Sequence, residues 1–400
     1  MKNEQKTFNQ TIDIAQLLPI FHPRLGVKLD ITTQDNLISI NWVNKNKEGQ
    51  PLNPQNQPKI LTVPRFIAID ENFGEIMGLY FGDGTKNDRR CIEFANFCPE
   101  LIKLWIKHIS DYGIDVNSLS FKVKVSENAK IKYKINEEKI IDYWKRIINI
   151  PFEKEIKLIW VKANGSPSSY LQMYGTLSAI FNNTTLSLFY NTLIKNIPRF
   201  IEQNRSFRIG FMRGLIAADG NINIRKNGSL SLVRIAGDKN ERYFIAHILE
   251  RYFKIKTKED KSNQIYFGNI KNFRIIKKLN LHILHPDKKF LFEKSYSILL
   301  KNLNRKHDEN AVLKNKKAIK ILRLLSEKST LYSNIIKKLN VSRCYVKILF
   351  NGYNHGYKYH YNGLTKLGLV SFVRNPSRRC EFIWKITKKG RMYFNTLVRE

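Results

Sequence analysis

Apolar residues gather in two helix-like runs of equal length that end in nearly the same seven residues. The runs cover 73–81 and 209–217, and the motifs at their ends read GLYFGDG at 78–84 and GLIAADG at 214–220. Both have the form Gly-Leu-x-x-small-Asp-Gly. Asp-Gly alone is an ordinary helix stop followed by a turn, but two copies with the same downstream order need another explanation. We predict two helices packed side by side, which bring Asp83 and Asp219 to a shared point.

The same order of hydrophobic patterns follows each motif. After the first come strand signals at 85–95, a helix at 101–112, alternating strands at 121–125 and 131–135, and a helix at 137–148. After the second come a hairpin at 221–235 with an Asn-Gly turn, a helix at 241–253, a strand at 264–268 and a helix at 270–279. This order predicts an internal duplication: a first repeat at 71–155, a linker with helices at 156–205 that ends a helix at Pro198, and a second repeat at 206–303.

Different patterns flank the duplication. Residues 1–70 alternate apolar and polar positions at 27–31 and 37–42, which predicts a β-rich extension. Residues 312–400 show amphipathic helices at 316–327 and 330–339, and a helix start capped by Ser342. Residues 364–370 resemble the end of a recognition helix that runs into a wing strand, with a basic tip at 374–379. We therefore expect a winged helix-turn-helix-like DNA-binding domain at the C-terminal end.

The net charge of the chain indicates what kind of partner it binds. Lys and Arg number 69 against 34 Asp and Glu, a net charge of +35 in 400 residues. Such an excess repels itself unless a polyanion shields it, so nucleic acid is the expected partner. No apolar run approaches the length of a membrane span, and the first residues carry no apolar signal core. We expect no membrane contact, no secretion, and an intracellular location in cytoplasm, nucleoid or organelle. The four cysteines lack zinc-site spacing.

The two aspartates indicate metal chemistry. A carboxylate at a helix C-terminus meets the negative end of the helix dipole, at a cost of about 0.3–1 kcal/mol. Two carboxylates brought together disfavour each other's ionised form as well. An arrangement that does this twice calls for a cation, and oxygen ligands favour Mg²⁺. The small residues Gly82, Ala217 and Ala218 would let the two backbones approach closely.

The paired motifs resemble those of the LAGLIDADG homing endonucleases in their single-chain, two-repeat form. The resemblance covers roughly residues 71–300, and the approach to the second motif, IPRFI at 197–201 followed by FMRGL at 211–215, is similar too. It implies an α+β fold of two tandem αββαββα repeats, whose curved antiparallel sheets form a pseudo-two-fold saddle over DNA. Phe81 and Ala217 replace the first Asp of the family motif, a position that varies and is not the metal ligand.

The resemblance also implies the reaction and its residues. It implies Mg²⁺-dependent double-strand cleavage across the minor groove with short 3′ overhangs, with Mn²⁺ able to substitute. Metal-activated water would attack each scissile phosphate. Asp83 and Asp219 would hold the metal, next to Gly82 and Ala218. The family places a basic residue near each site: Lys132 or Lys134 fits the first repeat, with Lys132 taken as catalytic, whereas residues 265–267 offer none in the second.

Basic and amide side chains on the predicted strands and in the C-terminal domain are the candidate contacts to double-stranded DNA. They are Lys122, Lys124, Lys134, Asn223, Arg225, Lys226, Arg234, Arg343, Lys347, Lys366, Arg378 and Arg379.

Three functions remain open for a monomer with internal pseudo-symmetry. The first is a site-specific endonuclease with a long recognition site. The second is a non-cleaving transcriptional regulator, since sporulation regulators resembling this family join a degenerate LAGLIDADG domain to a helix-turn-helix. The third is a maturase that binds intron RNA. Retention of both Asp83 and Asp219 favours the first.

Overall fold

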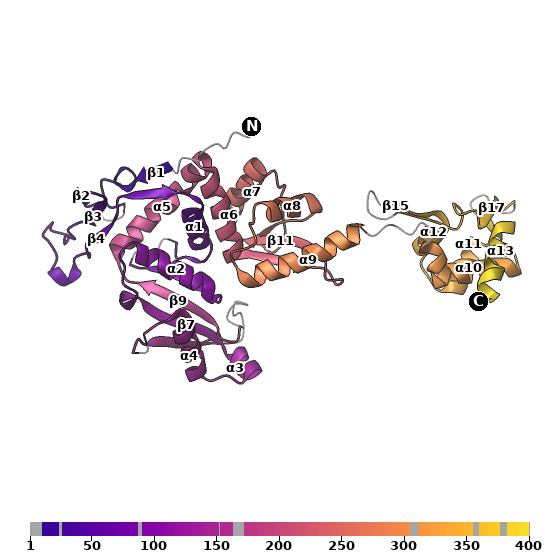
Figure 1. Cartoon of the computed structure of the whole chain (residues 1–400), viewed down its shortest axis with the longest axis horizontal. Helices are drawn as coiled ribbons and strands as arrows, with labels where there is room; N and C mark the ends of the chain where they lie inside the picture. The colour runs from indigo at the N-terminus through magenta and orange to yellow at the C-terminus, as the bar shows by residue number, and fades with distance from the viewer. Residues whose placement is uncertain are drawn as a thin grey trace, which may run out of the picture. The chain divides into compact units, whose positions relative to one another are not determined.

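The chain folds into two compact units. The computed structural model describes residues 10–23, 26–86, 90–151, 153–162, 172–304, 311–354, 360–376 and 382–399. The N-terminal unit is Met1–Ile298 and the C-terminal unit is Leu299–Glu400 (Figure 1). The whole is a mixed α and β structure with several small sheets.

The first 70 residues are rich in strands, as the alternation predicts. Strand β1 (Gln10–Asp13) pairs with β5 (Phe66–Ile69), and β2 (Asp30–Gln34), β3 (Leu37–Asn41) and β4 (Leu61–Pro64) form a second sheet. Ile38 and Ile40 point to one buried face of β3 because successive side chains alternate between faces.

Two central helices carry the motifs. Helix α1 (Glu71–Asp83) and helix α6 (Arg205–Asp219) lie side by side in the N-terminal unit (Figure 1). Each begins at a side-chain cap: Asp70 accepts from the backbone of Phe73, and Asn204 accepts from that of Phe207. The prediction of two adjacent helices ending at the two aspartates is confirmed.

A four-stranded sheet follows each helix. The first contains β6 (Ile92–Asn96), β7 (Ser120–Ser126), β8 (Ile156–Val161) and β9 (Thr176–Phe181) in the order β6-β9-β7-β8. The second contains β10 (Gly220–Ile224), β11 (Leu230–Ala236), β12 (Lys258–Glu259) and β13 (Gln264–Phe267) in the order β10-β11-β13-β12. In the first sheet, β6, β9 and β7 therefore stand in the same order as β11, β13 and β12 in the second. The bridge between Gly84 and Phe94 corresponds to the pairing of β10 with β11.

Helices pack on one face of each sheet. They are α2 (Pro99–Asp111), α4 (Glu137–Ile148) and α5 (Thr184–Gln203) for the first, and α7 (Lys239–Phe253) for the second, whose last strand is followed by α8 (Ile270–Lys278). Helix α9 (Pro286–Asn304) follows the second sheet and its helices.

Three sequence predictions in the first half are wrong. Residues 131–135 are not a strand, because Ser126 caps helix α3 (Glu127–Tyr133) there, and Ile131 is 76% exposed. Residues 156–205 are not a linker: β8 and β9 belong to the first sheet, and α5 is its covering helix. Helix α5 also continues through Pro198, where the sequence predicted its end, because Ile197 before the proline and Phe200 after it are both buried in the core. Residues 127–161 thus have no counterpart between β12 and β13 of the second sheet.

The C-terminal unit combines helices with a three-stranded sheet. Its helices are α10 (Lys316–Glu327), α11 (Tyr332–Leu339), α12 (Arg343–Asn351) and α13 (Lys388–Arg399). The sheet order is β14-β18-β17, from β14 (Thr330–Leu331), β17 (Val370–Arg374) and β18 (Phe382–Ile386), and β15 (Gly352–Asn354) pairs separately with β16 (His360–Asn362). Ser342 caps α12 as predicted.

Residues 364–370 do not form a helix end; the helix before the sheet is α12, followed by the β15–β16 hairpin and a turn. Among the described residues, no helix combines the length and apolarity that a membrane crossing needs.

Candidate active site

Glycines bring α1 and α6 into unusually close contact. Gly74 and Gly78 on α1 face Gly210 and Gly214 on α6, with a spacing of four residues that keeps them on one helix face. A Cβ atom at any of these four positions would lie under 3.0 Å from backbone atoms of the opposite helix. The two backbones therefore touch directly, which fixes the distance between the helix ends.

We call this glycine-lined contact between α1 and α6 the glycine seam. The two motif aspartates lie together at one end of it, where both helices finish. A Cβ at Gly82 would fall 3.0 Å from Asp219 Oδ2, so the end of α1 packs against the second carboxylate. The glycine that follows each aspartate is required locally: a Cβ at Gly84 or Gly220 would collide with the backbone of Tyr80 or Ile216, one turn earlier. The structure thus brings Asp83 and Asp219 together, flanked by Gly82 and Ala218.

Burial makes both carboxylates reluctant to ionise. Burial first, and then the charge of Asp219, raise the pKa of Asp83 to about 7, against a hydrogen bond from Asn96 Nδ2 to Asp83 Oδ2 (2.6 Å). Burial likewise raises the pKa of Asp219 to about 6, opposed by the charges of Lys86 and Lys288. Two carboxylates held in this state form a site that favours a cation.

Lys288 is the basic residue that the sequence did not reveal. It lies in the first turn of α9, and its Nζ donates to the carbonyls of Ile216 (3.2 Å), Ala217 (2.5 Å) and Ala218 (2.8 Å). The ammonium therefore caps the C-terminus of α6, where the helix dipole is negative. Burial lowers the pKa of Lys288 to about 8, while Asp83 and Asp219 raise it. No motif flags it, because only the packing of α9 brings it to the end of α6.

Lys86 supplies the second cation. It stands three residues after Asp83, forms an ion pair with Glu241 of α7 and lies 4.4 Å from the ring centroid of Phe81. Its charge lowers the pKa of both aspartates. Lys86 thereby links the loop after the first motif to the helix that covers the second sheet.

A buried ion pair also crosses the seam. Arg213, 7% exposed, pairs with Glu75 and lies 2.6 Å from Glu71 Oε1 on the opposite helix. It also donates to the backbone carbonyls of Asn280 (2.9 Å) and Leu279 (3.2 Å). Burial raises the pKa of Glu75 in spite of this partner. The pair fixes the register of the two helices.

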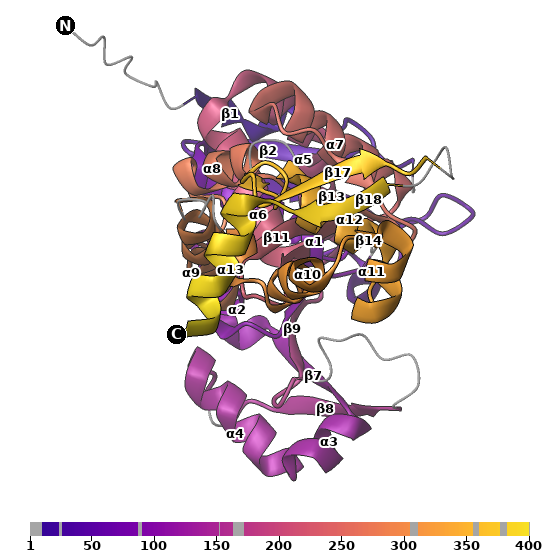
Figure 2. The ribbon, with the colours of Figure 1, turned by 90° about the vertical axis from the view of Figure 1, so that its right-hand side faces the viewer.

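Lys132 and Lys134 lie away from this site. Lys132 is exposed on α3 and covers the ring of Tyr133, and Lys134 ends the same helix in a left-handed conformation. Figures 1 and 2 both show α3 and α4 at the far end of the first sheet from α1 and α6. The prediction of Lys132 as the basic catalytic residue was tied to a strand at 131–135 that does not form; Lys86 and Lys288 are the described lysines whose charges act on both aspartates.

The face of the first sheet opposite its helices carries some of the candidate DNA contacts. Lys122 and Lys124 share it with Lys157, which pairs with Lys122 across β7 and β8. Lys122 also lies 3.5 Å from Glu93.

The second sheet carries a matching polar row. Asn221, Arg234, Tyr266 and Lys258 stand opposite one another across its four strands. Asn223 occupies the next position on that face, and Arg225 and Lys226 are exposed in the turn after β10. Two helix-covered sheets thus each present a face with basic residues.

The remaining candidates belong to the C-terminal unit. Arg343 and Lys347 are exposed on α12, and Lys366 is exposed in the turn before β17. Arg378 and Arg379 lie outside the described residues.

The donor set suits a metal that needs few protein ligands. In the described part of the chain, no three or more His, Cys, Asp or Glu side chains gather at one point. Asp83 and Asp219 are a pair of buried oxygen donors with raised pKa. Mg²⁺ commonly binds through one or two carboxylates, waters and substrate phosphates. The pair fits that mode, although Lys288 already occupies the Ala218 carbonyl.

Distant similarity to solved structures accompanies this geometry. No protein-family model and no curated protein sequence matches the chain. A structure of I-DmoI in complex with DNA and Ca is 14% identical, covers 56% of this chain and 97% of that one, and has a TM-score of 0.27. Full-length DUF199/WhiA from Thermatoga maritima is 13% identical, covers 70% and 88%, and has a TM-score of 0.30.

Proposed function

We propose that the protein is a LAGLIDADG-type DNA endonuclease that makes Mg²⁺-dependent double-strand breaks at a long recognition site. One observation carries the proposal: two buried carboxylates, Asp83 and Asp219, meet at the ends of two glycine-packed helices. The strands that follow these helices belong to two sheets with basic faces, which suits a polyanion.

The chain's own residues have distinct tasks in this proposal. Asp83 and Asp219 would hold Mg²⁺, and Asn96 orients Asp83 by its hydrogen bond. Bound Mg²⁺ supplies charge neutralisation at the phosphate and favours ionisation of water. Lys86 and Lys288 balance part of the negative charge of the carboxylates. The sheet faces contact phosphates and base edges of double-stranded DNA.

The C-terminal unit fits a second DNA-binding module. Its order of helix, short strand, two helices, the β15–β16 hairpin, two strands and a last helix supports a winged helix-turn-helix-like domain in this proposal. Residues 299–400 contain 23 Lys and Arg against five Asp and Glu. We assign it the role of increasing affinity for DNA, since linked modules raise each other's effective concentration.

The test is cleavage of a random-sequence plasmid library by the full-length protein with Mg²⁺. Broken ends are captured by ligation and sequenced. We expect recurrent double-strand breaks at one site, abolished by EDTA and by Asp83→Asn or Asp219→Asn. Asp35→Asn is the matched control, because Asp35 is exposed in a turn with φ of 49°, which Asn also adopts readily. Specific binding without breaks under Mg²⁺ or Mn²⁺ would reject the endonuclease.

One observation favours the regulator as the second candidate. The Lys288 ammonium already caps α6 beside the carboxylates, so the protein itself supplies a cation there. A regulator would bind one DNA sequence with equal affinity in Mg²⁺ and in EDTA. The endonuclease would instead bind more tightly, or cut, when Mg²⁺ is added.

A further inference from the structure

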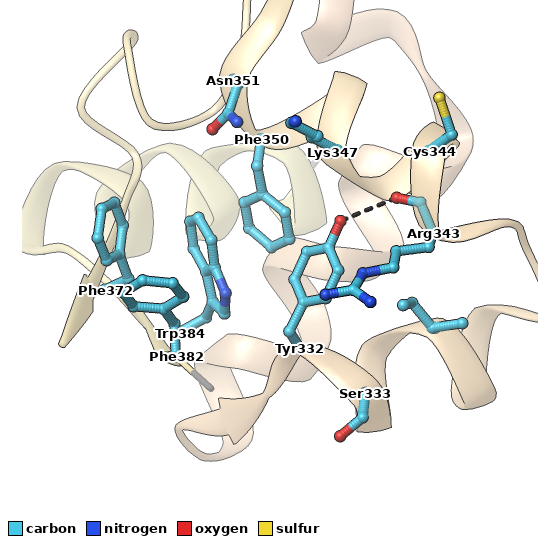
Figure 3. Close-up of a pocket in the computed structure, with 11 residues that line it drawn as sticks. Tyr332, Ser333, Arg343, Cys344, Lys347, Phe350, Asn351, Phe372, Phe382 and Trp384 are labelled. Carbon is cyan, nitrogen blue, oxygen red and sulfur yellow. Dashed lines mark hydrogen bonds between the residues drawn. The ribbon is translucent and has the colours of Figure 1, made fainter. Parts of the chain in front are cut away.

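The C-terminal unit contains a large hollow lined by aromatic rings. The cavity measures about 1070 Å³ and is bounded by α11, α12, β17 and β18 (Figure 3). Five of its lining residues are aromatic: Tyr332, Phe350, Phe372, Phe382 and Trp384. It lies on the exposed side of α12, the helix that the winged-helix proposal would place against DNA.

The rings form one continuous series. Phe350 stacks on Trp384 with centroids 3.8 Å apart, and Trp384 lies 5.0 Å from Phe372, which lies 5.1 Å from Phe382. The inner rings belong to the core, with Trp384 only 6% exposed. The outer two do not, since Phe372 is 46% and Phe382 38% exposed. The outer rings thus leave a large part of their surface uncovered by the described chain, beside inner rings that are fixed by core packing.

Positive charge surrounds these rings. Arg343 and Lys347 stand one helical turn apart on α12 and both line the hollow. None of its described lining residues is acidic. The whole unit, residues 299–400, has a net charge of +18. An occupant should therefore be flat, aromatic and anionic.

We propose that this hollow binds an unpaired nucleotide of a nucleic-acid strand, with its base stacked on Phe372 and Phe382 and its phosphates beside Arg343 and Lys347. Exposed aromatic rings flanked by cations are the means by which proteins hold single strands. A base within a duplex has both faces covered by its neighbours and shows only its edges to a protein. A purely protein partner would not require this excess of positive charge. The inference goes beyond double-strand binding and cleavage by the N-terminal unit.

The test uses the full-length chain carrying Asp83→Asn, in EDTA, with a fluorescein-labelled oligo-thymidine of about 15 nucleotides and a duplex of equal length. Fluorescence anisotropy gives both affinities. We expect Phe372→Ala and Phe382→Ala each to weaken single-strand binding about tenfold, while duplex binding changes less than about twofold. Arg343→Ala should weaken single-strand binding and reduce its salt dependence.

Phe290→Ala is the matched control, because Phe290 is also an exposed phenylalanine (67%) but lies on α9 in the N-terminal unit. Both pocket substitutions are at the surface, and circular dichroism confirms that the variants fold. Single-strand affinity that survives both substitutions overturns the proposal and leaves a protein-docking surface. Equal losses on duplex and single strand also overturn it. Because the assay runs without metal, failure of cleavage in the library experiment leaves its outcome unaffected.

Discussion

The glycine seam between α1 and α6 yields the most direct prediction. Replacing Gly78 or Gly214 by alanine adds one methyl group at the closest approach of the two backbones. At Gly214 the new Cβ would lie 2.7 Å from Leu79 N and nearer still to the Glu75 carbonyl oxygen. At Gly78 it would lie 2.9 Å from Leu215 N, with the Phe211 carbonyl oxygen closer. Backbone atoms cannot rotate away as side chains do, so the helices must separate.

The size of the effect is a balance of two terms. Ordinary Cβ contacts begin at about 3.4 Å, so the helices must part by well over about 0.7 Å at Gly214, because the Glu75 carbonyl oxygen is closer than Leu79 N. Overpacking of this kind costs about 1–3 kcal/mol, and a collision with backbone lies at the upper end or beyond. Alanine returns about 1 kcal/mol through its better helix propensity. We expect a net loss of about 2 kcal/mol, which corresponds to a fall in Tm of about 3 °C for a unit of this size.

Thermal unfolding followed by circular dichroism measures this loss, and plasmid cleavage measures its consequence for the site. Gly214→Ala should also reduce cleavage more than it reduces stability, because it shifts Asp219 relative to Asp83. Gln203→Ala serves as the control, since Gln203 is exposed near the end of α5. A larger side chain, as in Gly214→Val, should cost more than alanine. A higher Tm for Gly78→Ala and Gly214→Ala would refute the direct backbone contact between α1 and α6, because the better helix propensity of alanine would then set the stability.

Three further predictions concern charge at the site. Without metal, the stability that protonated Asp83 and Asp219 confer is full below about pH 4, since their ordinary pKa is 3.8, and is lost as pH rises through about 6 and 7. The Tm gained on adding Mg²⁺ should therefore grow over that range and vanish in Asp83→Asn. Lys288→Met should lower the free energy of unfolding in urea by about 3 kcal/mol. It should also move the onset of the Mg²⁺ effect to higher pH, because the charge of Lys288 lowers the pKa of both aspartates. An unchanged onset would exclude this role of the charge. Arg213→Met should lower the free energy of unfolding by about 3–5 kcal/mol, because it leaves Glu75 buried and unpaired. Adding Glu75→Gln to that variant should restore part of the lost stability. No recovery in the double variant would contradict the ion-pair explanation.

Local patterns predicted those parts of the fold that local rules decide. Helices at 137–148 and 316–327 have the predicted limits, and the Asn227-Gly228 hairpin forms as expected, with φ of 79° at Gly228. The segment 130–135 failed because its alternating lysines suit a strand, yet Ser126 offers a helix cap and the chain leaves the sheet there. The parallel pairing of β7 with β8 depends on residues far apart in the sequence, which a local pattern cannot report.

The sequence likewise revealed only those residues of the site that belong to a recurring motif. Asp83 and Asp219 were found because their motif is written twice in the sequence, each with the glycine that the turn requires. Asn96 and Lys288 were not found, since neither stands at a recurring position. Asn96 reaches Asp83 because β6 returns alongside α1, and Lys288 reaches α6 because α9 does. The signal that was available is Lys288 itself, a lysine in the first turn of a helix, where the dipole disfavours a cation.

The two carboxylates come from matching motifs, but the lysines that act most strongly on them are exchanged between the two parts of the chain. Asp83, from the first motif, has Lys288 as its strongest positive neighbour, which comes from the helix after the second sheet. Asp219, from the second motif, has Lys86, which comes from the loop after the first. Asn96 bonds only Asp83, whereas the nearby Glu241 opposes ionisation of Asp219. Each aspartate thus has its largest balancing charge from the part of the chain that carries the other aspartate.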